Sequence, residues 1–253
     1  MKTDKKTVKL YEPYFPEFWQ KHEKKLKSIG KKNIKSLFLY EFVIDNEGII
    51  LFKQKFFEGK KLIYQPITII QTALDLYNDY CSDQDEIKKM MFLKYAEKAS
   101  SLLTGSRGGA AFYSTVRQKI AGYKFKKPYR WTGCMENGMF LSVLIRAHSI
   151  TNEKKYLLLA KKLLPPFEIE VGKGGFRSVD RDGNWWYEEF GAEISRHHVL
   201  NGFVYALLGL HEYYEYTKET KAKNLFERGI KTLDKNLGVF DINLLFFLSL
   251  IHI

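Results

Sequence analysis

The sequence GKGGFRSVDRDGNWWYEEFGAEISRHHVLNGFVYALLGL, residues 172–210, concentrates turn signals, aromatic rings, carboxylates and the start of an apolar helix. Within it, Asp182-Gly183 is a strong signal for a hairpin turn, and Gly174-Gly175 opens the first of two predicted strands. The second strand would carry residues 185–189, WWYEE, toward the helix that follows. The stretch therefore predicts a β-hairpin that presents aromatic rings and carboxylates at the open end of a concave array of helices.

Helical periodicity begins at Ile67 and continues through three pairs of apolar segments. The pairs begin near residues 67, 136 and 199, with a predicted cap at Ser82-Asp83 and a turn near Thr151-Asn152. Each pair recurs after about 65 residues and needs its neighbours to bury its apolar face. The predicted fold is mainly α, an incomplete α/α toroid of antiparallel helix pairs with β-hairpin insertions and a small N-terminal β or irregular segment.

The chain upstream of the helices has a different character. Residues 1–35 hold eleven lysines against four acidic residues, and Leu37–Phe52 alternates apolar and polar residues around a turn at Asp45–Gly48. We therefore expect three parts. They are a basic segment with a short β-hairpin over residues 1–63, a toroidal domain over 64–241, and an atypical apolar tail over 242–253.

Two long insertions, Gly105–Trp131 and Phe167–Glu189, each end just before the first helix of the next pair. They should lie on one rim, beside the amino-terminal ends of those helices. The unpaired N–H groups and partial positive charge of a helix amino terminus favour an anion. The fold by itself therefore predicts an anion site on this rim.

Composition adds weaker constraints. The net charge of +12 suits an anionic partner, but much of the excess lies in residues 1–35, and no nucleic-acid motif accompanies it. Cys81 and Cys134 lack the paired spacing of zinc ligands. No apolar run predicts a secretory signal or a spanning helix, so we expect a cytoplasmic chain without a transmembrane segment.

Four segments, in order, resemble the C-terminal domain of the D-glucuronyl C5-epimerases. They are LIYQPITIIQTALDLY from Leu62, the run from Arg130 to Val171 that begins RWTGCMENGMF, WYEEF from Trp186, and VLNGF from Val199. The resemblance implies conversion of glucuronate to iduronate in an acidic polysaccharide of the heparan or heparosan type, with no cofactor and compatibility with a homodimer. A divalent metal is compatible with the family, although no ligand cluster identifies positions for one.

Epimerisation at C5 needs one group to remove a proton and another, across the sugar ring, to return one. Glu189 matches the family glutamate at the end of the WYEE segment, although a surface hairpin also accounts for a carboxylate there. If strand alternation continues, Glu188 points to the opposite face, so only one of the pair should point inward. The catalytic candidates are Glu189, Tyr187 and Tyr64.

The substrate-binding candidates follow from the chemistry of a charged sugar. Guanidinium groups can neutralise a uronate, indole rings can stack on a pyranose, and asparagine can hold a hydroxyl or simply cap a helix. Of two adjacent tryptophans, we expect one to stack on sugar and one to pack in the core. The candidates are Trp131, Arg130, Glu136, Trp186, Arg177, Arg196 and Asn201, whereas His197-His198 reads as polar packing.

The chain departs from the family pattern at two places. Phe190 stands where the family commonly has tyrosine, so its ring lacks a hydroxyl for proton transfer. Phe240 also replaces tyrosine, and INLLFFLSLIHI after Asp241 does not match the motif, which indicates a truncation or frame break. A uronate lyase, a hydrolase using Glu136 with Glu189, and an inactive carbohydrate-binding remnant remain alternatives to an epimerase.

Overall fold

The computed structural model describes residues 41–54, 61–116, 119–120, 123–124, 129–191 and 197–240. Contacts along the chain divide it into two compact units, residues 1–68 and 69–253. The domain boundaries at residues 63 and 241 remain predictions. Tyr64 belongs to the first unit, and the other described candidate residues belong to the second.

The first unit contains a three-stranded antiparallel sheet in the order β1-β2-β3, formed by β1 (Glu41–Ile44), β2 (Ile50–Gln54) and β3 (Lys61–Ile63). Asp45 shapes the turn between β1 and β2, because its Oδ1 accepts hydrogen bonds from the N–H of Glu47 and of Ile49, at 2.8 and 2.9 Å. Gly48 closes this turn with φ +81°, which suits glycine. The predicted strands and turn are confirmed over the described residues, and β3 is an additional strand.

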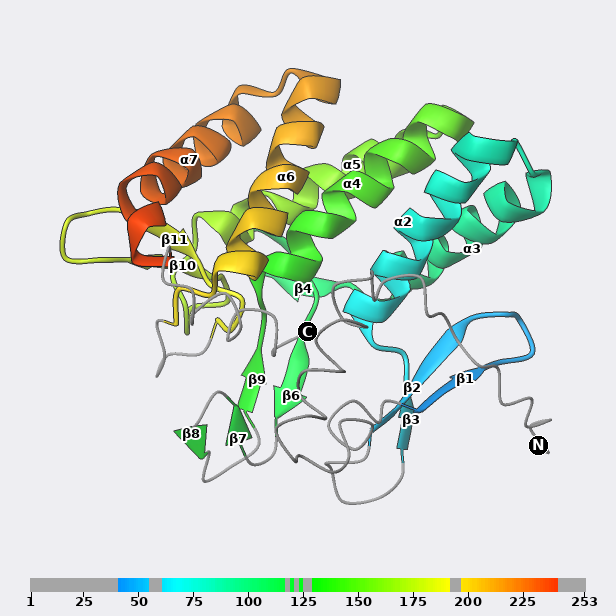
Figure 1. Cartoon of the computed structure of the whole chain (residues 1–253), viewed down its shortest axis with the longest axis horizontal. Helices are drawn as coiled ribbons and strands as arrows, with labels where there is room; N and C mark the ends of the chain where they lie inside the picture. The colour runs from blue at the N-terminus through cyan, green and yellow to red at the C-terminus, as the bar shows by residue number, and fades with distance from the viewer. Residues whose placement is uncertain are drawn as a thin grey trace, which may run out of the picture. The chain divides into compact units, whose positions relative to one another are not determined.

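The second unit consists mainly of three antiparallel helix pairs, which follow one another across Figure 1. The predicted mainly-α architecture and the starts of all three pairs are confirmed. The helices are α2 (Pro66–Asp83), α3 (Glu86–Leu102), α4 (Cys134–Thr151), α5 (Lys154–Leu163), α6 (Leu200–Thr217) and α7 (Thr220–Phe240).

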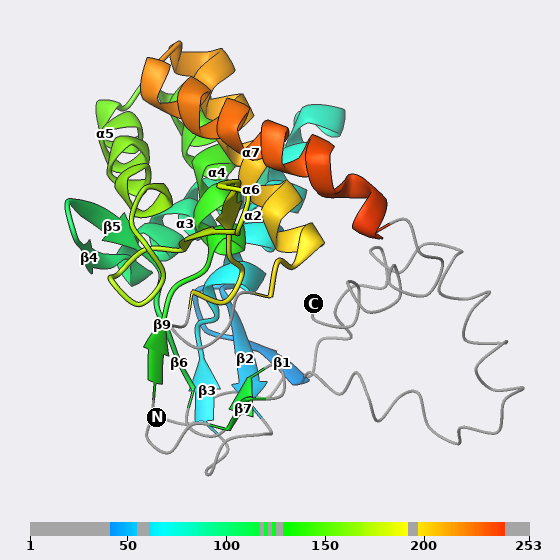
Figure 2. The ribbon, with the colours of Figure 1, turned by 90° about the vertical axis from the view of Figure 1, so that its left-hand side faces the viewer.

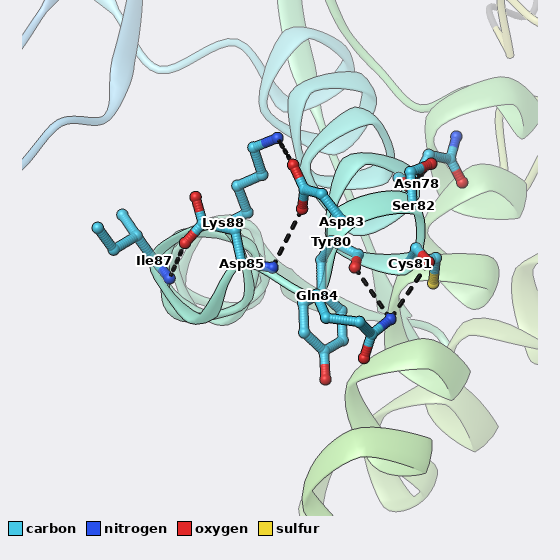
Figure 3. Close-up of polar contacts among 9 residues, drawn as sticks. All are labelled: Asn78, Tyr80, Cys81, Ser82, Asp83, Gln84, Asp85, Ile87 and Lys88. Atoms are coloured by element: carbon cyan, nitrogen blue, oxygen red, sulfur yellow. Dashed lines mark hydrogen bonds and ion pairs between the residues drawn. The ribbon is translucent and has the colours of Figure 1, made fainter.

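The turn between α2 and α3 differs from the prediction in its cap. Asp85, rather than Ser82-Asp83, is the N-cap of α3, and its side chain accepts a hydrogen bond from the N–H of Ile87 at 2.8 Å (Figure 3). Gln84 adopts φ +57°, and its side-chain amide donates to the carbonyls of Tyr80 and Cys81 at the end of α2. Helix α2 therefore runs through the predicted cap and ends at Asp83.

Strands fill the two insertions between the helix pairs. The β4 (Thr104–Ser106) and β5 (Gly109–Ala111) hairpin lies beside α5 in Figure 2, whereas β6 (Ser114–Val116) pairs with β9 (Tyr129–Trp131). Between them β7 (Lys119–Ile120) pairs with β8 (Tyr123–Lys124). In the second insertion, a 3-10 turn, η2 (Pro165–Phe167), precedes the antiparallel pair β10 (Arg177–Val179) and β11 (Trp185–Tyr187). Gly183 adopts φ +79° between these strands, as the predicted hairpin turn requires.

Helix α4 lies in the middle of the array, with α6 on one side and the α2–α3 pair on the other (Figure 1). Its first twelve residues, 134–145, are all buried, as expected for a helix that packs on several sides. The crossing with α6 is close: a Cβ on Gly138 would lie 2.4 Å from the Cα of Ala206, and one on Gly209 would lie 1.9 Å from the carbonyl oxygen of Gly138. The two backbones therefore meet where neither glycine leaves room for a side chain.

Polar contacts join α4 and α6 beyond the glycine crossing. Arg146 on α4 donates two hydrogen bonds to the Glu212 carboxylate on α6, at 2.5 and 3.0 Å. One turn further along α6, the Tyr216 hydroxyl lies 2.7 Å from the Nδ1 atom of His148 on α4. These contacts lie in the carboxyl-terminal halves of both helices, away from their amino-terminal ends.

Substitution of Gly209 by alanine tests the close crossing. The added Cβ would overlap the backbone of α4, so we expect Gly209→Ala to lower the free energy of unfolding by about 1–3 kcal/mol. Urea unfolding followed by circular dichroism measures the change. The matched control is Gly238→Ala on α7, which adds a Cβ in open space and should raise stability by up to about 1 kcal/mol. Equal effects of the two substitutions would contradict the crossing.

Candidate active site

The two insertions meet at the amino terminus of α4. The N–H of Cys134, the first residue of α4, donates to the carbonyl of Glu188 at 2.9 Å. The N–H of Gly191 donates to the carbonyl of Thr132, also at 2.9 Å. The segment before α4 therefore runs beside the segment that follows β11, as expected for a shared rim.

Glu189 lies between the starts of α4 and α6. Its side chain is buried, with 6% of its surface exposed, and its carboxylate accepts a hydrogen bond from the N–H of Gly202 in the first turn of α6. A Cβ on Gly202 would lie 2.6 Å from Oε2 of Glu189, so the close approach requires glycine here. Burial raises the pKa of Glu189 to about 7, and the Gly202 bond opposes this rise only in part.

Glu136 supplies a second buried carboxyl group in the first turn of α4. Its pKa is raised to about 8, mainly by burial and also by the negative charge of Glu189, whereas N–H groups at the start of the helix oppose the rise. Two carboxyl groups with pKa values near neutrality can each hold or release a proton near pH 7. This pair is the chemical centre of the candidate site.

Glu188 is also buried, which corrects the expectation that only one of the two adjacent carboxylates points inward. Strand β11 ends at Tyr187, so the alternation of a regular strand does not extend to Glu188 and Glu189. The carboxylate of Glu188 accepts hydrogen bonds from the Ser178 hydroxyl and from the N–H of His198. The two neighbouring carboxylates thus reach different partners.

Tyr187 lies in the core rather than at an open rim. Its side chain is 1% exposed, and its hydroxyl donates to the carbonyl of Leu225 on α7 at 2.7 Å. Burial raises the pKa of this hydroxyl well above its ordinary value. The ring packs against Phe167 and Phe203, so the position favours a structural role over the predicted proton transfer.

The two adjacent tryptophans have different surroundings. Trp186 is buried: its Nε1 donates to Asp180 at 3.2 Å, and its ring lies 4.3 Å from the His198 ring and 5.0 Å from the Phe203 ring. Trp185 is half-buried, between the guanidinium groups of Arg177 and Arg228 at 4.6 and 4.3 Å. The core position of Trp186 does not favour its predicted contact with sugar.

Trp131 lies near the backbone of Glu189. A Cβ on Gly133 would lie 2.0 Å from the carbonyl oxygen of Glu189 and 3.2 Å from the Trp131 ring, so these residues share one small region. The Trp131 ring packs on Phe190, with 5.2 Å between ring centres, and Phe190 also contacts His197. The Nε1 atom of Trp131 is buried, and no described residue accepts its hydrogen bond.

Asn201 also has unsatisfied polar atoms. It lies in the first turn of α6, immediately before Gly202, and both amide atoms of its side chain are buried. Within the described part of the chain neither atom has a hydrogen-bond partner. Because buried polar groups are normally paired, this amide marks a place where a ligand hydroxyl or a water molecule fits.

The remaining predicted residues lie elsewhere. Arg130 is exposed, donates to the Thr104 hydroxyl at 3.0 Å and stacks on the Tyr113 ring at 3.9 Å. Arg177 pairs with Glu170 at 3.3 Å.

In the first unit, Tyr64 donates to Asp45 at 2.7 Å, a bond that raises the pKa of the tyrosine to about 12. Arg196 lies outside the described residues.

A sequence model described as the C-terminus of D-glucuronyl C5-epimerase matches residues 110–253 of this chain, which is more than half of it. The chain belongs to the D-glucuronyl C5-epimerase family. The match includes residues 242–253, which the motif comparison left outside the family pattern.

Two relatives show the extent of this kinship. The chain is 34% identical over 138 residues to the D-glucuronyl C5-epimerase of Caenorhabditis elegans. The matched stretch covers 50% of this chain and 22% of the worm protein. It is 28% identical over 114 residues to an uncharacterized protein of Methanocaldococcus jannaschii, covering 44% of this chain and 37% of that protein. The chain therefore matches well under half the length of either relative.

A solved structure supports the architecture. The fold is similar to that of a GH76 alpha-mannanase from Bacteroides thetaiotaomicron, with a TM-score of 0.50 and 13% identity over 77% of this chain and 51% of that chain. At this identity the likeness concerns the fold alone. It agrees with an α/α toroid built from helix pairs.

Sequence reasoning overlooked Asn137, in the MENG segment of this family member. The side chain is fully buried, donates to the carbonyl of Gly133 at 2.6 Å and to the Thr132 hydroxyl at 3.1 Å, and accepts from the N–H of Phe112 at 3.1 Å. It therefore holds the strand before α4 in place beside Glu136. An amide beside Glu136, in the buried first half of the helix, was the available signal.

Two further observations concern membranes and metals. Over the described ranges, no helix is both long and apolar enough to cross a bilayer. In the same residues, no cluster of three or more histidine, cysteine or acidic side chains has the arrangement of a metal site. Cys134 is buried and donates to the carbonyl of Tyr187 at 3.0 Å, whereas Cys81 is exposed.

Tyr187→Phe tests the core position of this tyrosine. The substitution removes the hydroxyl and leaves the carbonyl of Leu225 without that bond, so we expect a loss of about 1 kcal/mol in the free energy of unfolding. Urea unfolding measures the loss. Tyr205→Phe on α6 is the control, because no described residue bonds its hydroxyl, and it should change stability by less than about 0.5 kcal/mol. An unchanged stability of Tyr187→Phe would contradict the assignment.

The raised pKa values of Glu136 and Glu189 predict a pH dependence of stability. Between about pH 4.5 and 8 the native state holds protons that the unfolded chain releases, so the free energy of unfolding falls as pH rises, by at most about 1.4 kcal/mol per pH unit for each group. Glu136→Gln should make this fall smaller. Urea unfolding at pH 5 and pH 8 measures it, with exposed Glu227→Gln as the control. A fall as steep as that of the wild type would exclude a raised pKa at Glu136.

Proposed function

We propose that this chain supplies the catalytic centre for epimerisation at C5 of glucuronate residues in an acidic polysaccharide, giving iduronate. The main support is Glu189, a buried carboxyl group with a pKa of about 7 that lies beside the first turn of α6. A base with this pKa can exist in either protonation state at neutral pH, as proton abstraction and return require. Membership of the epimerase family supports the same reaction.

The reaction breaks the C5–H bond and later forms a new one on the opposite face of the ring. Glu189 accepts the C5 proton, and the electron pair moves onto the adjacent carboxylate as an enolate-like intermediate. A second acid then delivers a proton to C5 from the other face. We assign this part to Glu136, a buried carboxyl group whose pKa of about 8 keeps it protonated at neutral pH.

The intermediate carries additional negative charge, which the site must stabilise as it forms. The amino termini of α4 and α6 present N–H groups and partial positive charge on this rim. Asn201 would donate a hydrogen bond to a sugar hydroxyl or carboxylate through its buried amide, and Trp131 would donate through Nε1. The family tyrosine is replaced by Phe190, so in this chain a carboxyl group takes its part in proton transfer.

Other features of the whole protein stay predictions. The roles assigned to Arg196 and Tyr64, assembly as a homodimer and the type of acidic polymer rest on the family resemblance. The proposed partner is an acidic polysaccharide, and the reaction as proposed uses neither nucleic acid nor a cofactor.

Hydrogen exchange at C5 tests the proposed function. We expect the wild-type chain, incubated in deuterated water with a heparosan-type polymer, to introduce deuterium at C5 without shortening the polymer. Glu189→Gln should lower the exchange rate by at least about 10²-fold, the usual contribution of a general base. Exposed Glu215→Gln is the matched control and should retain the wild-type rate.

The same assay separates the alternatives. An unsaturated, ultraviolet-absorbing chain end would indicate a lyase, and new reducing ends without unsaturation would indicate a hydrolase. Binding of the polymer without exchange or cleavage would indicate a carbohydrate-binding remnant. Each of these results would overturn the proposed epimerase.

A further inference from the structure

Glu188 is a buried carboxylate that the proposed proton transfer does not use. None of its side chain is exposed. Its carboxylate accepts hydrogen bonds from the Ser178 hydroxyl on β10 and from the backbone N–H of His198 at 3.0 Å. One of its oxygens also lies 3.4 Å from Nδ1 of the His198 ring. A charge is costly to bury unless it is bonded in this way, so the contacts hold the side chain in one position.

The backbone of Glu188 makes two more connections. Its N–H donates to the carbonyl of Phe176 at 2.7 Å, and its carbonyl accepts from the N–H of Cys134 at 2.9 Å. The side chain and backbone together join the β10–β11 hairpin, the start of α4 and the segment before α6.

The contact with His198 occurs where the chain is locally strained. His198 adopts φ +48°, in the left-handed region that costs a non-glycine residue about 1–2 kcal/mol. The bond from its N–H to Glu188 supports this conformation. Two residues later α6 begins, and the N–H of its third residue, Gly202, bonds the carboxylate of Glu189.

We infer that Glu188 is a positioning residue for Glu189: by fixing His198 and the start of α4, it sets the place of the Gly202 N–H relative to the proton-transferring carboxylate. This inference rests on the proposed function for the role of Glu189. Glu188 itself touches neither substrate nor a reacting atom. A shift of about 1 Å in such an arrangement can cost about 10²-fold in rate, so a residue outside the reaction can control it.

The test compares glutamine variants of Glu188, which is buried, and Glu212, which is half-buried. Glu188→Gln keeps the shape of the side chain but weakens its bonds to Ser178 and His198. The matched control, Glu212→Gln, removes a carboxylate that bonds Arg146 across the α4–α6 contact without any connection to His198. Both variants should lose stability in urea unfolding. Only Glu188→Gln should lower kcat for C5 exchange, by about tenfold or more, with KM within about twofold.

A second readout does not depend on activity. In protein carrying 13C-labelled glutamate side chains, NMR titration follows the Glu189 carboxyl resonance, assigned by its loss in Glu189→Gln. We expect its midpoint to shift by at least about half a pH unit in Glu188→Gln, because the Gly202 bond changes, and to stay in place in Glu212→Gln. Absence of exchange in the wild type would count against the proposed function alone, because the titration still tests whether Glu188 positions Glu189.

A milder variant keeps the test decisive if Glu188→Gln does not fold. Ser178→Ala removes one donor to Glu188 and should change kcat and the Glu189 titration in the same direction, by smaller amounts. If Glu188→Gln is folded and leaves both quantities at wild-type values, the inference is wrong. If Glu188→Gln does not fold, wild-type values of both quantities in Ser178→Ala overturn it instead.

Discussion

The close crossing of α4 and α6 is the constraint on which the candidate site depends. Gly138, Ala206 and Gly209 leave so little room that the two helix backbones are in contact. Because the helices approach this closely, their amino-terminal turns lie near each other, and Glu136 and Glu189 share one buried region. A larger residue at either glycine would separate the helices and move the first turn of α6, which contains Gly202, away from the start of α4.

Burial decides the acidity of these carboxyl groups. A helix amino terminus stabilises a carboxylate by about 0.3–1 kcal/mol, and one pKa unit corresponds to about 1.4 kcal/mol, so this effect is smaller than one unit. The pKa of Glu189 nevertheless rises from 4.5 to about 7, and that of Glu136 to about 8. Desolvation therefore outweighs the helix termini. The same termini stay available to stabilise an anionic ligand or intermediate.

The fold and the site carry different information about function. The GH76 alpha-mannanase shares the arrangement of helix pairs at 13% identity, so the arrangement by itself does not distinguish hydrolysis from epimerisation. The family match and the buried carboxyl groups narrow the range of reactions that the site could catalyse. Phe190, which packs between Trp131 and His197, shows that this chain fills the place of a family tyrosine with a purely apolar ring.

The sequence by itself determined the local structure and the kinship of this protein. Helical periodicity located the three pairs, Asp182-Gly183 located the hairpin turn, and the WYEEF and VLNGF segments identified the family, because each signal lies within a short stretch of chain. The α3 cap was misplaced by two residues, since Ser82, Asp83 and Asp85 all have suitable side chains.

Only the tertiary structure decided which side chains face the site. Tyr187 bonds Leu225, Cys134 bonds Glu188, and Glu188 reaches His198 beyond the end of β11. These contacts join segments that no local pattern relates. The burial that raises the pKa of Glu189 likewise comes from residues distant in sequence. For this reason the sequence pattern could identify both carboxylates as candidates, whereas only the packing showed that the two have different partners.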